Sequence, residues 1–517
     1  MGRARWEVVT AALTALVLLW TWPARAQEPS PGPTTFERLD AFLEQAASEA
    51  AIPGLSVVVV VGGEIAYTKS LGVADGSGRP ITADTPFVLA SVSKAFTAAC
   101  VMQLREAGAL DLDAPVQRYL PWFRVADEQA SAQITLRQLL HHTAGLPHLW
   151  PPDDADAGAL ERYVRSFDRA QLIGVPGDRH FYTDAAYEVL ALIVQTVSGM
   201  PYDEYLAQHI FGPLGMTHSH ALAADAHADG AAEGYYSWFG AATLPTRVPQ
   251  ERAKAGSATT FSSANDMGRW LIAHMNGGRL GPAQILSAEG IATLHAPAVA
   301  TDPSHGYAMG WDVRPLWEAL DPAPGVPTTA YHLPALVEHG GRAANGHTYV
   351  GFVPDRGWGF AMLMNINDVT AESRYMHTEQ GILAILSGAD PPVARIYEGP
   401  LILYGKQIAM ALLVLELVSL LWVLDRMRRW RRPQPARSTW MRRALAMAVP
   451  LLLDLLVIYL FLVVAPATLG APLDIVLHYT PDLPYVIWPS LALAAVWGPI
   501  RTLLMVLLVP RTRPLAV

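Results

Sequence analysis

The sequence has little cysteine and little charge. Its single cysteine, Cys100, excludes an intrachain disulfide and any metal site or cluster built from several cysteines. Charged residues make up 16% of the 517 residues and the net charge is -9, which excludes a strongly basic surface for nucleic acid. Apolar residues make up 51%. Since soluble proteins carry about 25% charged residues, we expect part of this chain to lie away from water.

Lysine is also scarce, because only four of the 37 basic residues are lysines and the rest are arginines. The bias toward arginine is typical of a GC-rich genome. A lysine in such a chain is still a candidate for acid–base chemistry, because an ammonium group can lose its proton and a guanidinium group cannot. The four are Lys69, Lys94, Lys254 and Lys406.

The apolar excess is concentrated at the two ends of the chain. Residues 1–26 begin with Arg3 and Arg5 and continue with an apolar run and a small-x-small motif, which is the pattern of a signal peptide; an uncleaved anchor is the alternative. Residues 27–399 contain no apolar run long enough to cross a bilayer and are expected to form one domain. Three segments of the remaining 400–517, at 408–424, 444–464 and 486–509, have the length and composition of transmembrane helices.

The loops between these helices predict the topology. The loop after the first helix carries eight arginines, whereas the loop at 465–485 carries no basic residue. By the positive-inside rule the arginine loop is cytoplasmic. The C-terminus then lies in the cytoplasm and the large domain outside, as the signal peptide also requires. We therefore expect a multi-pass protein of the bacterial inner membrane whose large domain faces the periplasm.

Three ionisable residues, Glu416, Asp454 and Arg501, lie within the predicted spans. Such groups usually face a neighbouring helix or a cavity rather than lipid. Because each helix supplies one and both signs are present, we expect them to pair and hold the bundle together. A proton path is the alternative, and the helices leave open a homodimer formed through the membrane.

The patterning of the large domain predicts an α/β (α+β) fold. The expected elements are a helix at 35–50, strands at 55–61 and 64–67 joined by Gly62-Gly63, a mainly helical stretch at 91–290, and strands at 338–353 and 359–365. Strands at both ends with a helical insertion imply one antiparallel sheet flanked by helices, plus an all-α subdomain. A cleft between the two parts is the natural place for a site.

Ser91 and Lys94 are the first candidates for chemistry. A spacing of three residues places both side chains on one face of the first turn of a helix. The helix start favours an oxyanion and disfavours a second positive charge, and partial burial lowers the pKa of a lysine further. A neutral Lys94 amine would then accept the proton of the Ser91 hydroxyl. Taken alone, the pattern also fits a capping serine followed by a solvated lysine.

Two later motifs accompany this pair. Tyr182 and Asp184 precede a helix predicted over 185–197, and His339-Gly340-Gly341 stands at the start of a predicted strand, where glycines let a backbone approach a ligand closely. Alone, each of these residues would fit an ordinary packing role.

In combination, the serine–lysine pair, the tyrosine motif and the histidine–glycine motif resemble the serine β-lactamase and penicillin-binding-protein superfamily, specifically its class C and D-peptidase branch. Residues 134–146, 213–216 and 264–267 are similar to the connecting segments of that branch. The resemblance covers about 36–386 and implies a β-lactamase-like serine hydrolase.

The resemblance implies a role for each motif residue. Ser91 would be the acylated nucleophile, Lys94 its proton acceptor, and Tyr182 the residue that relays a proton to the leaving group. His339 would contact the substrate or polarise Tyr182. The oxyanion hole would be formed by the backbone N–H groups of Ser91 and of Arg342, the residue after the glycines.

Asp184 departs from the family pattern, which usually has asparagine at this position. An amide both donates and accepts hydrogen bonds, while a carboxylate only accepts them. We therefore expect Asp184 to pair with a Lys94 ammonium or to hold a substrate N–H group. The departure argues against ordinary β-lactamase activity and leaves the nucleophile unaffected.

The predicted transmembrane helices narrow the range of expected substrates. The layout is similar to that of the prodrug-activating peptidases of nonribosomal-peptide pathways, including the one that matures colibactin, which implies removal of an N-acyl-D-asparagine leader from an exported prodrug. An acyl chain partitions into the bilayer and would meet a tethered site at high local concentration. Two alternatives are a broader esterase or D-amino-acid peptidase acting on envelope material, and a β-lactam sensor that is acylated without turnover.

No cofactor or metal is expected. The sequence has no metalloprotease helix motif, no phosphate-binding glycine loop and no dinucleotide fingerprint. A His/Asp-rich stretch at 218–229 lacks fixed ligand spacing, so we interpret it as a solvated loop. The expected partners are a small peptide or acyl-peptide substrate and the lipid bilayer.

Overall fold

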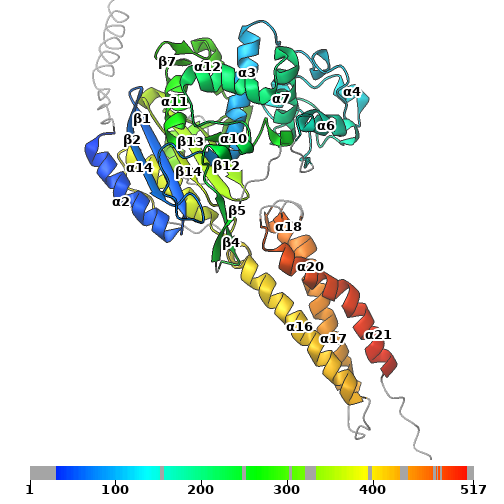
Figure 1. The fold of residues 1–517 in the computed structure, drawn as a ribbon. Helices are drawn as coiled ribbons and strands as arrows, with labels where there is room; N and C mark the ends of the chain where they lie inside the picture. The colour runs from blue at the N-terminus through cyan, green and yellow to red at the C-terminus, as the bar shows by residue number, and fades with distance from the viewer. Residues whose placement is uncertain are drawn as a thin grey trace, which may run out of the picture.

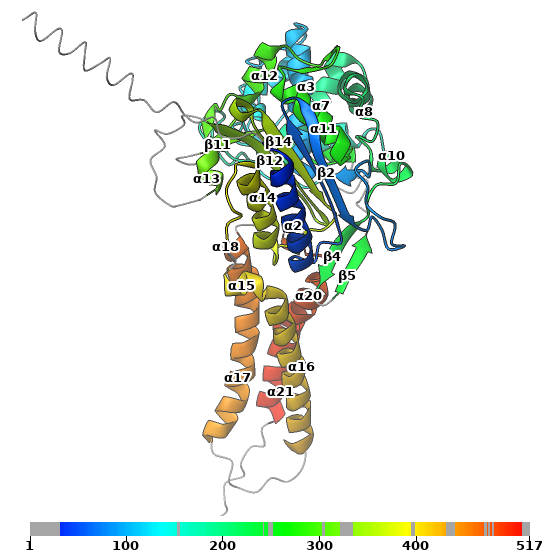
Figure 2. The ribbon, with the colours of Figure 1, turned by 90° about the vertical axis from the view of Figure 1, so that its left-hand side faces the viewer.

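The structure is a computed structural model that describes residues 31–151, 156–240, 242–246, 252–301, 305–320, 334–393, 399–430, 440–469, 473, 476–477 and 480–508. The signal peptide predicted at 1–26 lies outside the described residues. Figures 1 and 2 show a large α/β domain above a bundle of long helices.

One eight-stranded antiparallel sheet forms the centre of the large domain, with strand order β2-β1-β14-β13-β12-β11-β10-β9. Its strands are β1 (Gly54–Val61), β2 (Glu64–Gly72), β9 (Val299–Ala300), β10 (Gly306–Tyr307), β11 (Asp312–Pro315), β12 (Ala335–Ala343), β13 (Gly346–Val353) and β14 (Trp358–Met364). The first strand pairs with the last, so that Leu55 lies opposite Met364. The predicted single sheet, assembled from distant segments, is confirmed.

The β1–β2 hairpin forms where the sequence predicts it. Gly62 and Gly63 both have positive φ, 60° and 83°, which a tight two-residue hairpin turn requires. Alternate valines of β1 face opposite sides of the sheet, and both sides are buried. Val57 and Val59 join one hydrophobic core, and Val58 and Val60 join the other.

The prediction of one strand over 338–353 is wrong. The structure has two strands there, β12 and β13, which pair antiparallel across a turn that includes Asn345. All eight residues of β13 are buried, so the run has no alternation of polar and apolar side chains to mark the turn. An Asn-Gly pair, here Asn345-Gly346, was the available signal for a hairpin.

Helices cover both faces of the sheet. Helices α2 and α14 pack on one face, as Figure 2 shows, and α11 and α3 lie on the other. The helices are α2 (Pro33–Glu49), α3 (Ser93–Glu106), α4 (Glu128–Ser131), α5 (Leu136–Leu140), α6 (Ala159–Arg165), α7 (Asp184–Ser198), α8 (Tyr202–Leu206), α9 (Gly212–Leu214), α10 (Ala223–Ala228), α11 (Ala264–Met275), α12 (Ala288–His295), α13 (Leu316–Leu320) and α14 (Glu372–Leu386).

The helical insertion also holds short strands, which are β3 (Phe87–Val88), β4 (Gly234–Trp238), β5 (Ala242–Thr246), β6 (Phe261–Ser262), β7 (Arg279–Leu280) and β8 (Ala283–Gln284). Helices α3 and α7 pack against each other inside this region. Ten successive residues of α7, 185–194, are buried, so its start is held firmly within the domain.

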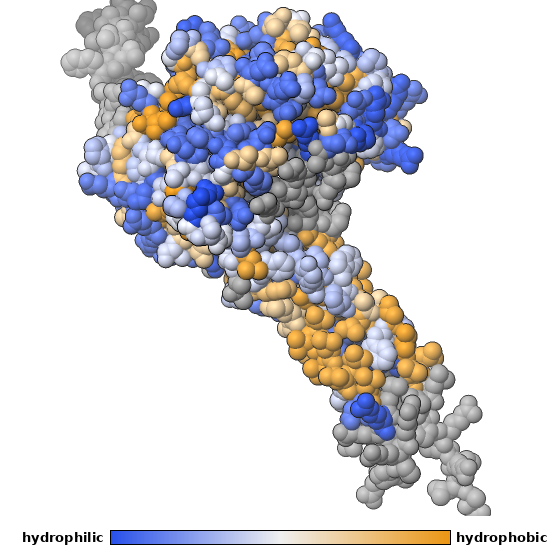
Figure 3. Space-filling view, viewed as in Figure 1, coloured by the Kyte–Doolittle hydropathy of each residue, from blue (hydrophilic) through white to orange (hydrophobic). Residues whose placement is uncertain are grey.

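Long apolar helices follow the large domain: α15 (Pro400–Leu403), α16 (Gly405–Trp430), α17 (Trp440–Tyr459), η8 (Leu460–Val464), α18 (Ala465–Leu469), α20 (Pro484–Ala492), η9 (Leu493–Trp497) and α21 (Gly498–Leu508). Three stretches, Gly405–Asp425, Ala448–Thr468 and Pro484–Leu504, are long and apolar enough to cross a membrane. Figure 3 shows a largely apolar surface along them, in contrast to the mixed surface of the large domain. These are the three candidate spans expected from the sequence, shifted by a few residues.

The ionisable residues of the spans lie together, as expected. Arg501 forms an ion pair with Asp454 and donates to the Ser419 hydroxyl at 3.0 Å. Glu416 lies beside Asp454. Each of the three spans therefore contributes to one polar cluster inside the bundle.

Lys406, at the start of α16, connects the bundle to the large domain. Its ammonium donates to Asp368 Oδ2 at 3.1 Å and to the Ser237 carbonyl of β4 at 2.6 Å, and it lies 3.0 Å from Asp482 Oδ2. Asp482 also accepts the Phe239 N–H at 2.8 Å. All three charged side chains are buried, so this cluster is an interior junction.

Candidate active site

Ser91 lies in a short 3-10 helix, η1 (Ala90–Val92), that leads from β3 into α3. Ala90, directly before it, has φ +48°, a left-handed conformation that is uncommon for a residue with a Cβ atom. The Leu89 N–H donates to the Thr260 carbonyl at 2.8 Å, which fixes the turn to the segment directly before β6. The turn places Ser91, which is only partly buried, at the start of a long buried helix.

Lys94 is fully buried one turn further on, and its ammonium reaches three acceptors. These are Ser91 Oγ at 3.1 Å, Asp184 Oδ1 at 2.6 Å and the Ser257 carbonyl at 3.2 Å. A lysine ammonium has three donors, so each of them has a partner here. The structure therefore brings together the first pair and the middle motif of the sequence prediction.

The Lys94 amine is held in its charged form. Burial alone would lower its pKa, but the Asp184 carboxylate, with a smaller contribution from Tyr182, raises the pKa above its ordinary value. Burial would likewise raise the pKa of Asp184, and the Lys94 ammonium instead lowers it. In the resting site Lys94 and Asp184 are paired, which is one of the two roles expected for Asp184, and the neutral amine that accepts the Ser91 proton stays a prediction.

Tyr182 covers this ion pair. The Lys94 ammonium lies 4.8 Å from the centre of the tyrosine ring, and the phenol interacts electrostatically with Lys94. Burial raises the pKa of Tyr182, and the positive charge of Lys94 opposes that rise. The phenol is therefore protonated at neutral pH and has a proton to donate.

His142 positions the middle motif, a role that the sequence did not reveal. Its ring centroid is 4.4 Å from that of Tyr182, its Nδ1 accepts the Thr183 N–H at 3.3 Å, and its Nε2 lies 3.2 Å from the Tyr307 hydroxyl. Burial, followed by the nearby Lys94 charge, lowers the pKa of His142 well below its usual range. A neutral ring with Nδ1 as acceptor carries its proton on Nε2 and donates it to Tyr307.

His339 faces the same group of side chains. Its ring centroid is 6.3 Å from that of Tyr182, and its Nδ1 lies 2.7 Å from the Gly340 carbonyl, so Nδ1 carries the proton. Burial, with a smaller effect of Lys94, lowers the pKa of His339 to about 3. Nε2 is therefore a buried acceptor with no hydrogen-bond partner in the described part of the chain. His339 lies within β12 and not at the start of a strand, as the sequence suggested.

The two residues after this motif have different environments. A Cβ atom on Gly341 would collide with the Leu89 carbonyl oxygen, so a glycine lets β12 touch the turn that holds Ser91. The Arg342 side chain is half exposed and pairs with Glu372 at 2.5 Å, on α14. The part proposed for Arg342 concerns its backbone N–H and stays a prediction.

Sequence reasoning also missed the group that positions Ser257. Glu188 lies one turn after Asp184 on α7, is fully buried, and accepts the Gly256 N–H at 2.9 Å. Gly256 packs directly against α7, and its carbonyl accepts the Thr97 hydroxyl at 2.6 Å. Burial raises the pKa of Glu188 to about 8, so the carboxyl is mostly neutral near pH 7.

The His/Asp-rich stretch is ordered by hydrogen bonds. His218 Nδ1 and His220 Nε2 lie 3.0 Å and 2.8 Å from the same oxygen of Asp229, and all three side chains are partly exposed. Among the described residues, no three His, Cys, Asp or Glu side chains form a group that could hold a metal ion.

A serine beside a buried lysine and a tyrosine, next to strand β12 of an antiparallel sheet covered by helices, defines a β-lactamase-like serine hydrolase. The sequence profile of the family described as Beta-lactamase matches residues 39–384. The chain belongs to this family, which confirms the predicted fold, the resemblance to the β-lactamase and penicillin-binding-protein superfamily, and the enzyme class.

Named relatives agree with this assignment. The chain is 28% identical over 344 residues to penicillin-binding protein 4 of Amycolatopsis lactamdurans, which covers 64% of this chain and 84% of that protein. It is 24% identical over 336 residues to protein flp of Staphylococcus aureus (strain MW2), covering 64% of this chain and 63% of the length of flp.

A solved structure shows the same fold. The octameric penicillin-binding protein homologue from Pyrococcus abyssi has a TM-score of 0.58 and 24% sequence identity to this chain, and the superposition covers 72% of this chain and 81% of that one.

Proposed function

We propose that the protein is a membrane-anchored serine peptidase that forms an acyl-enzyme at Ser91 and removes an N-acyl-D-asparagine-like leader from an exported nonribosomal peptide. The observation that supports an acyl-enzyme is the contact of Ser91 Oγ with the buried Lys94, whose ammonium also contacts a proton acceptor, the Asp184 carboxylate. The membrane anchor and the acceptor atoms of the site support the choice of leader.

Acylation begins with the Lys94–Asp184 pair. Acylation requires a neutral Lys94, which is a minor form because Asp184 raises the pKa of Lys94. In that form Lys94 has passed a proton to Asp184 Oδ1, 2.6 Å away, at a cost in free energy, and the amine takes the Ser91 proton across 3.1 Å as Oγ attacks the substrate carbonyl carbon. The C–N bond then breaks, and the leaving nitrogen takes its proton from the Tyr182 phenol, which Lys94 reprotonates. Water releases the acyl group by the reverse sequence, and the net reaction consumes one water.

The oxyanion of each tetrahedral intermediate would be held by the backbone N–H groups of Ser91 and Arg342. The close contact of Gly341 with the Leu89 carbonyl supports this arrangement, because it keeps β12 against the turn that carries Ser91.

A D-asparagine-like residue suits the acceptors of the site. Its side-chain amide has two N–H donors, and the site offers the unpaired His339 Nε2 and the carboxylate of Asp184, which is about one-third exposed. An N-linked acyl chain would keep the substrate at the bilayer in which the enzyme is anchored.

The test uses the full-length protein in detergent. A fluorophosphonate probe should label wild type and not Ser91→Ala, and an N-acyl-D-asparaginyl peptide should be cleaved while its L-asparaginyl isomer is not. Labelling that persists in Ser91→Ala would overturn the acyl-enzyme.

The product pattern separates the neighbouring functions. Equal cleavage of several D-amino-acid amides or of simple esters would indicate a broader esterase or D-peptidase. A burst of labelling by fluorescent penicillin without turnover of any substrate would indicate a sensor.

A further inference from the structure

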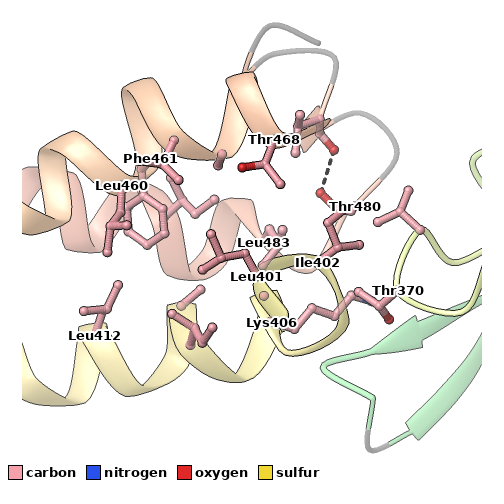
Figure 4. Close-up of a pocket in the computed structure, with 18 residues that line it drawn as sticks. Thr370, Leu401, Ile402, Lys406, Leu412, Leu460, Phe461, Thr468, Thr480 and Leu483 are labelled. Atoms are coloured by element: carbon pink, nitrogen blue, oxygen red, sulfur yellow. Dashed lines mark hydrogen bonds between the residues drawn. The ribbon is translucent and has the colours of Figure 1, made fainter. Parts of the chain in front are cut away.

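An apolar cavity lies where the candidate spans meet the large domain. Its volume is about 90 Å³, and its walls come from α15, the start of α16, η8, α18 and α20 (Figure 4). An apolar cavity of about 150 Å³ in another protein remains dry and binds benzene, so this space is on the scale of a short stretch of hydrocarbon.

The buried polar side chains at the wall, Lys406 and Thr480, already have partners. The Thr480 hydroxyl donates to the Val476 carbonyl at 2.6 Å, and the Lys406 ammonium is taken up by Asp368, Asp482 and the Ser237 carbonyl. A buried water needs two to four polar partners. The described wall therefore favours an apolar occupant over water.

The cavity extends from the end of the bundle toward its middle. Leu401 and Thr468 are exposed at the end nearer the large domain, whereas Ala409, Leu412 and Phe461 are buried further along the spans. Tyr404 and Tyr485 are more than half exposed at that same end of α16 and α20. Tyrosines are enriched at headgroup level, so the cavity begins near the headgroups and continues into the hydrocarbon layer.

The charge at the headgroup end selects among lipids. Lys406 is surrounded by two aspartates, which gives the junction a net charge of -1. An anionic headgroup would be repelled there, while a zwitterionic headgroup with an ammonium would not.

We propose that this cavity binds one acyl chain of a zwitterionic bilayer phospholipid. The chain fills the space between α16, η8 and α20, and the headgroup lies beside the Lys406 junction. Because Lys406 also holds Ser237 and Asp368, the bound lipid supports the joint between the anchor and the large domain.

The experiment uses the full chain in vesicles of phosphatidylethanolamine and phosphatidylcholine with a trace of phosphatidylcholine that carries a diazirine on one acyl chain. After illumination, the labelled peptides are mapped. We expect labelling concentrated on 401–412, 460–468 and 483–487, and a loss of most of that labelling when Ala409→Phe or Leu483→Phe fills the cavity.

Val414→Phe is the matched control, because Val414 is on the same helix but 57% exposed outside the cavity. It should keep full labelling of the cavity peptides. Fluorophosphonate labelling of Ser91 in each variant reports that the chain has folded, and its loss in all proteins would concern the proposed peptidase rather than the lipid site.

Three results would overturn the proposal. These are label spread evenly over the lipid-facing residues of the spans, equal labelling in both cavity-filling variants and wild type, and stronger labelling when phosphatidylglycerol replaces the zwitterionic lipids. Displacement of the label by an equimolar N-acyl-D-asparaginyl peptide would assign the cavity to the substrate instead.

Discussion

The family usually has asparagine at the position of Asp184, and the aspartate changes how the neighbouring Lys94 can act. Lys94 is fully buried, yet the carboxylate at 2.6 Å keeps it charged, so the resting site stores the base as an ion pair. Such a pair is stable only while both partners remain, because a single buried charge costs several kcal/mol. The chemistry of Ser91 therefore depends on how readily the pair shares its proton.

Asp184→Asn should move the pH dependence of acylation to lower pH. Asp184 raises the pKa of Lys94, so its removal lowers that pKa and makes the neutral amine available at lower pH. We expect the half-maximum of fluorophosphonate labelling to fall by about 1–3 pH units, the effect of one close opposite charge. The measurement is the labelling rate between pH 5 and 11, over which the wild-type rate should still be rising at the upper end while the variant rate levels off earlier.

Lys94→Ala is the control for this series, because it should remove labelling at every pH. An unchanged pH profile in Asp184→Asn, with labelling intact, would contradict the view that Asp184 sets the charge of Lys94.

Glu188→Gln should stabilise the protein at alkaline pH. Burial raises the pKa of Glu188 from about 4.5 to about 8 in the folded state, so the folded state binds more protons than the unfolded state between these values. Stability is then lost as pH rises through that window. A glutamine stays neutral and keeps an acceptor for the Gly256 N–H. The free energy of unfolding of Glu188→Gln relative to wild type should therefore be higher at pH 9 than at pH 4 by at least about 1 kcal/mol, the value of one pKa unit.

Thermal unfolding between pH 4 and 9 checks this expectation. Glu188→Ala, which leaves the Gly256 N–H without its acceptor, should be destabilised across the whole range. Parallel pH dependences in wild type and Glu188→Gln would show that Glu188 ionises normally in the folded protein.

At the scale of elements, the site depends on the contact between β12 and the turn at η1. Gly340 and Gly341 are neighbours in the strand but differ in environment. A Cβ atom at 341 would meet the Leu89 carbonyl, whereas nothing described lies within 4 Å of one at 340.

Gly341→Ala should therefore reduce the rate of Ser91 labelling by at least about tenfold, since forcing strand and turn apart by about an ångström misplaces reacting groups. Gly340→Ala should retain the wild-type rate to within about twofold, as expected of a change that meets no neighbour. The test is the labelling rate of each purified variant, measured at a temperature at which both variants are fully folded. Equal losses in both would argue against the contact.

The sequence predicted those features that depend only on residues close together in the chain. The β1–β2 hairpin, the three candidate spans and the facing of Ser91 and Lys94 all follow from residues that are close in the chain. The contacts of Lys94 with Asp184 and Ser257 join residues 90 and 163 positions apart, so only the packing of α3, α7 and the segment before β6 could reveal the charge of the lysine. Glu188 and His142 were missed for the same reason, because in sequence both resemble ordinary helix and turn residues.

At the scale of the whole molecule, one buried lysine joins the anchor to the catalytic domain. The junction of Lys406, Asp368 and Asp482 fixes the start of α16 to β4. In the proposed topology the entire large domain then lies on the side of the membrane where α16 begins. Single cysteines can test that sidedness, since the native Cys100 is buried.

A cysteine at Val393, which is 83% exposed, should react with a membrane-impermeant maleimide in intact spheroplasts. One at Arg428, which is exposed near the other end of α16, should react only after the membrane is permeabilised. Labelling of Arg428→Cys and not of Val393→Cys in intact spheroplasts would reverse the topology.

The pairing of β1 with β14 also sets an order of events during synthesis. Leu55 and Met364 are partners, so a strand made early must wait for about 300 further residues before its neighbour exists. In the proposed topology these residues cross the membrane one after another, and the sheet closes only shortly before α16 enters the bilayer. An open, apolar strand edge invites wrong pairing, so export must keep β1 shielded until then. The large domain therefore completes its sheet only just before synthesis of the anchor begins, and a chain stalled in translocation before β14 would have an incomplete sheet behind its active site.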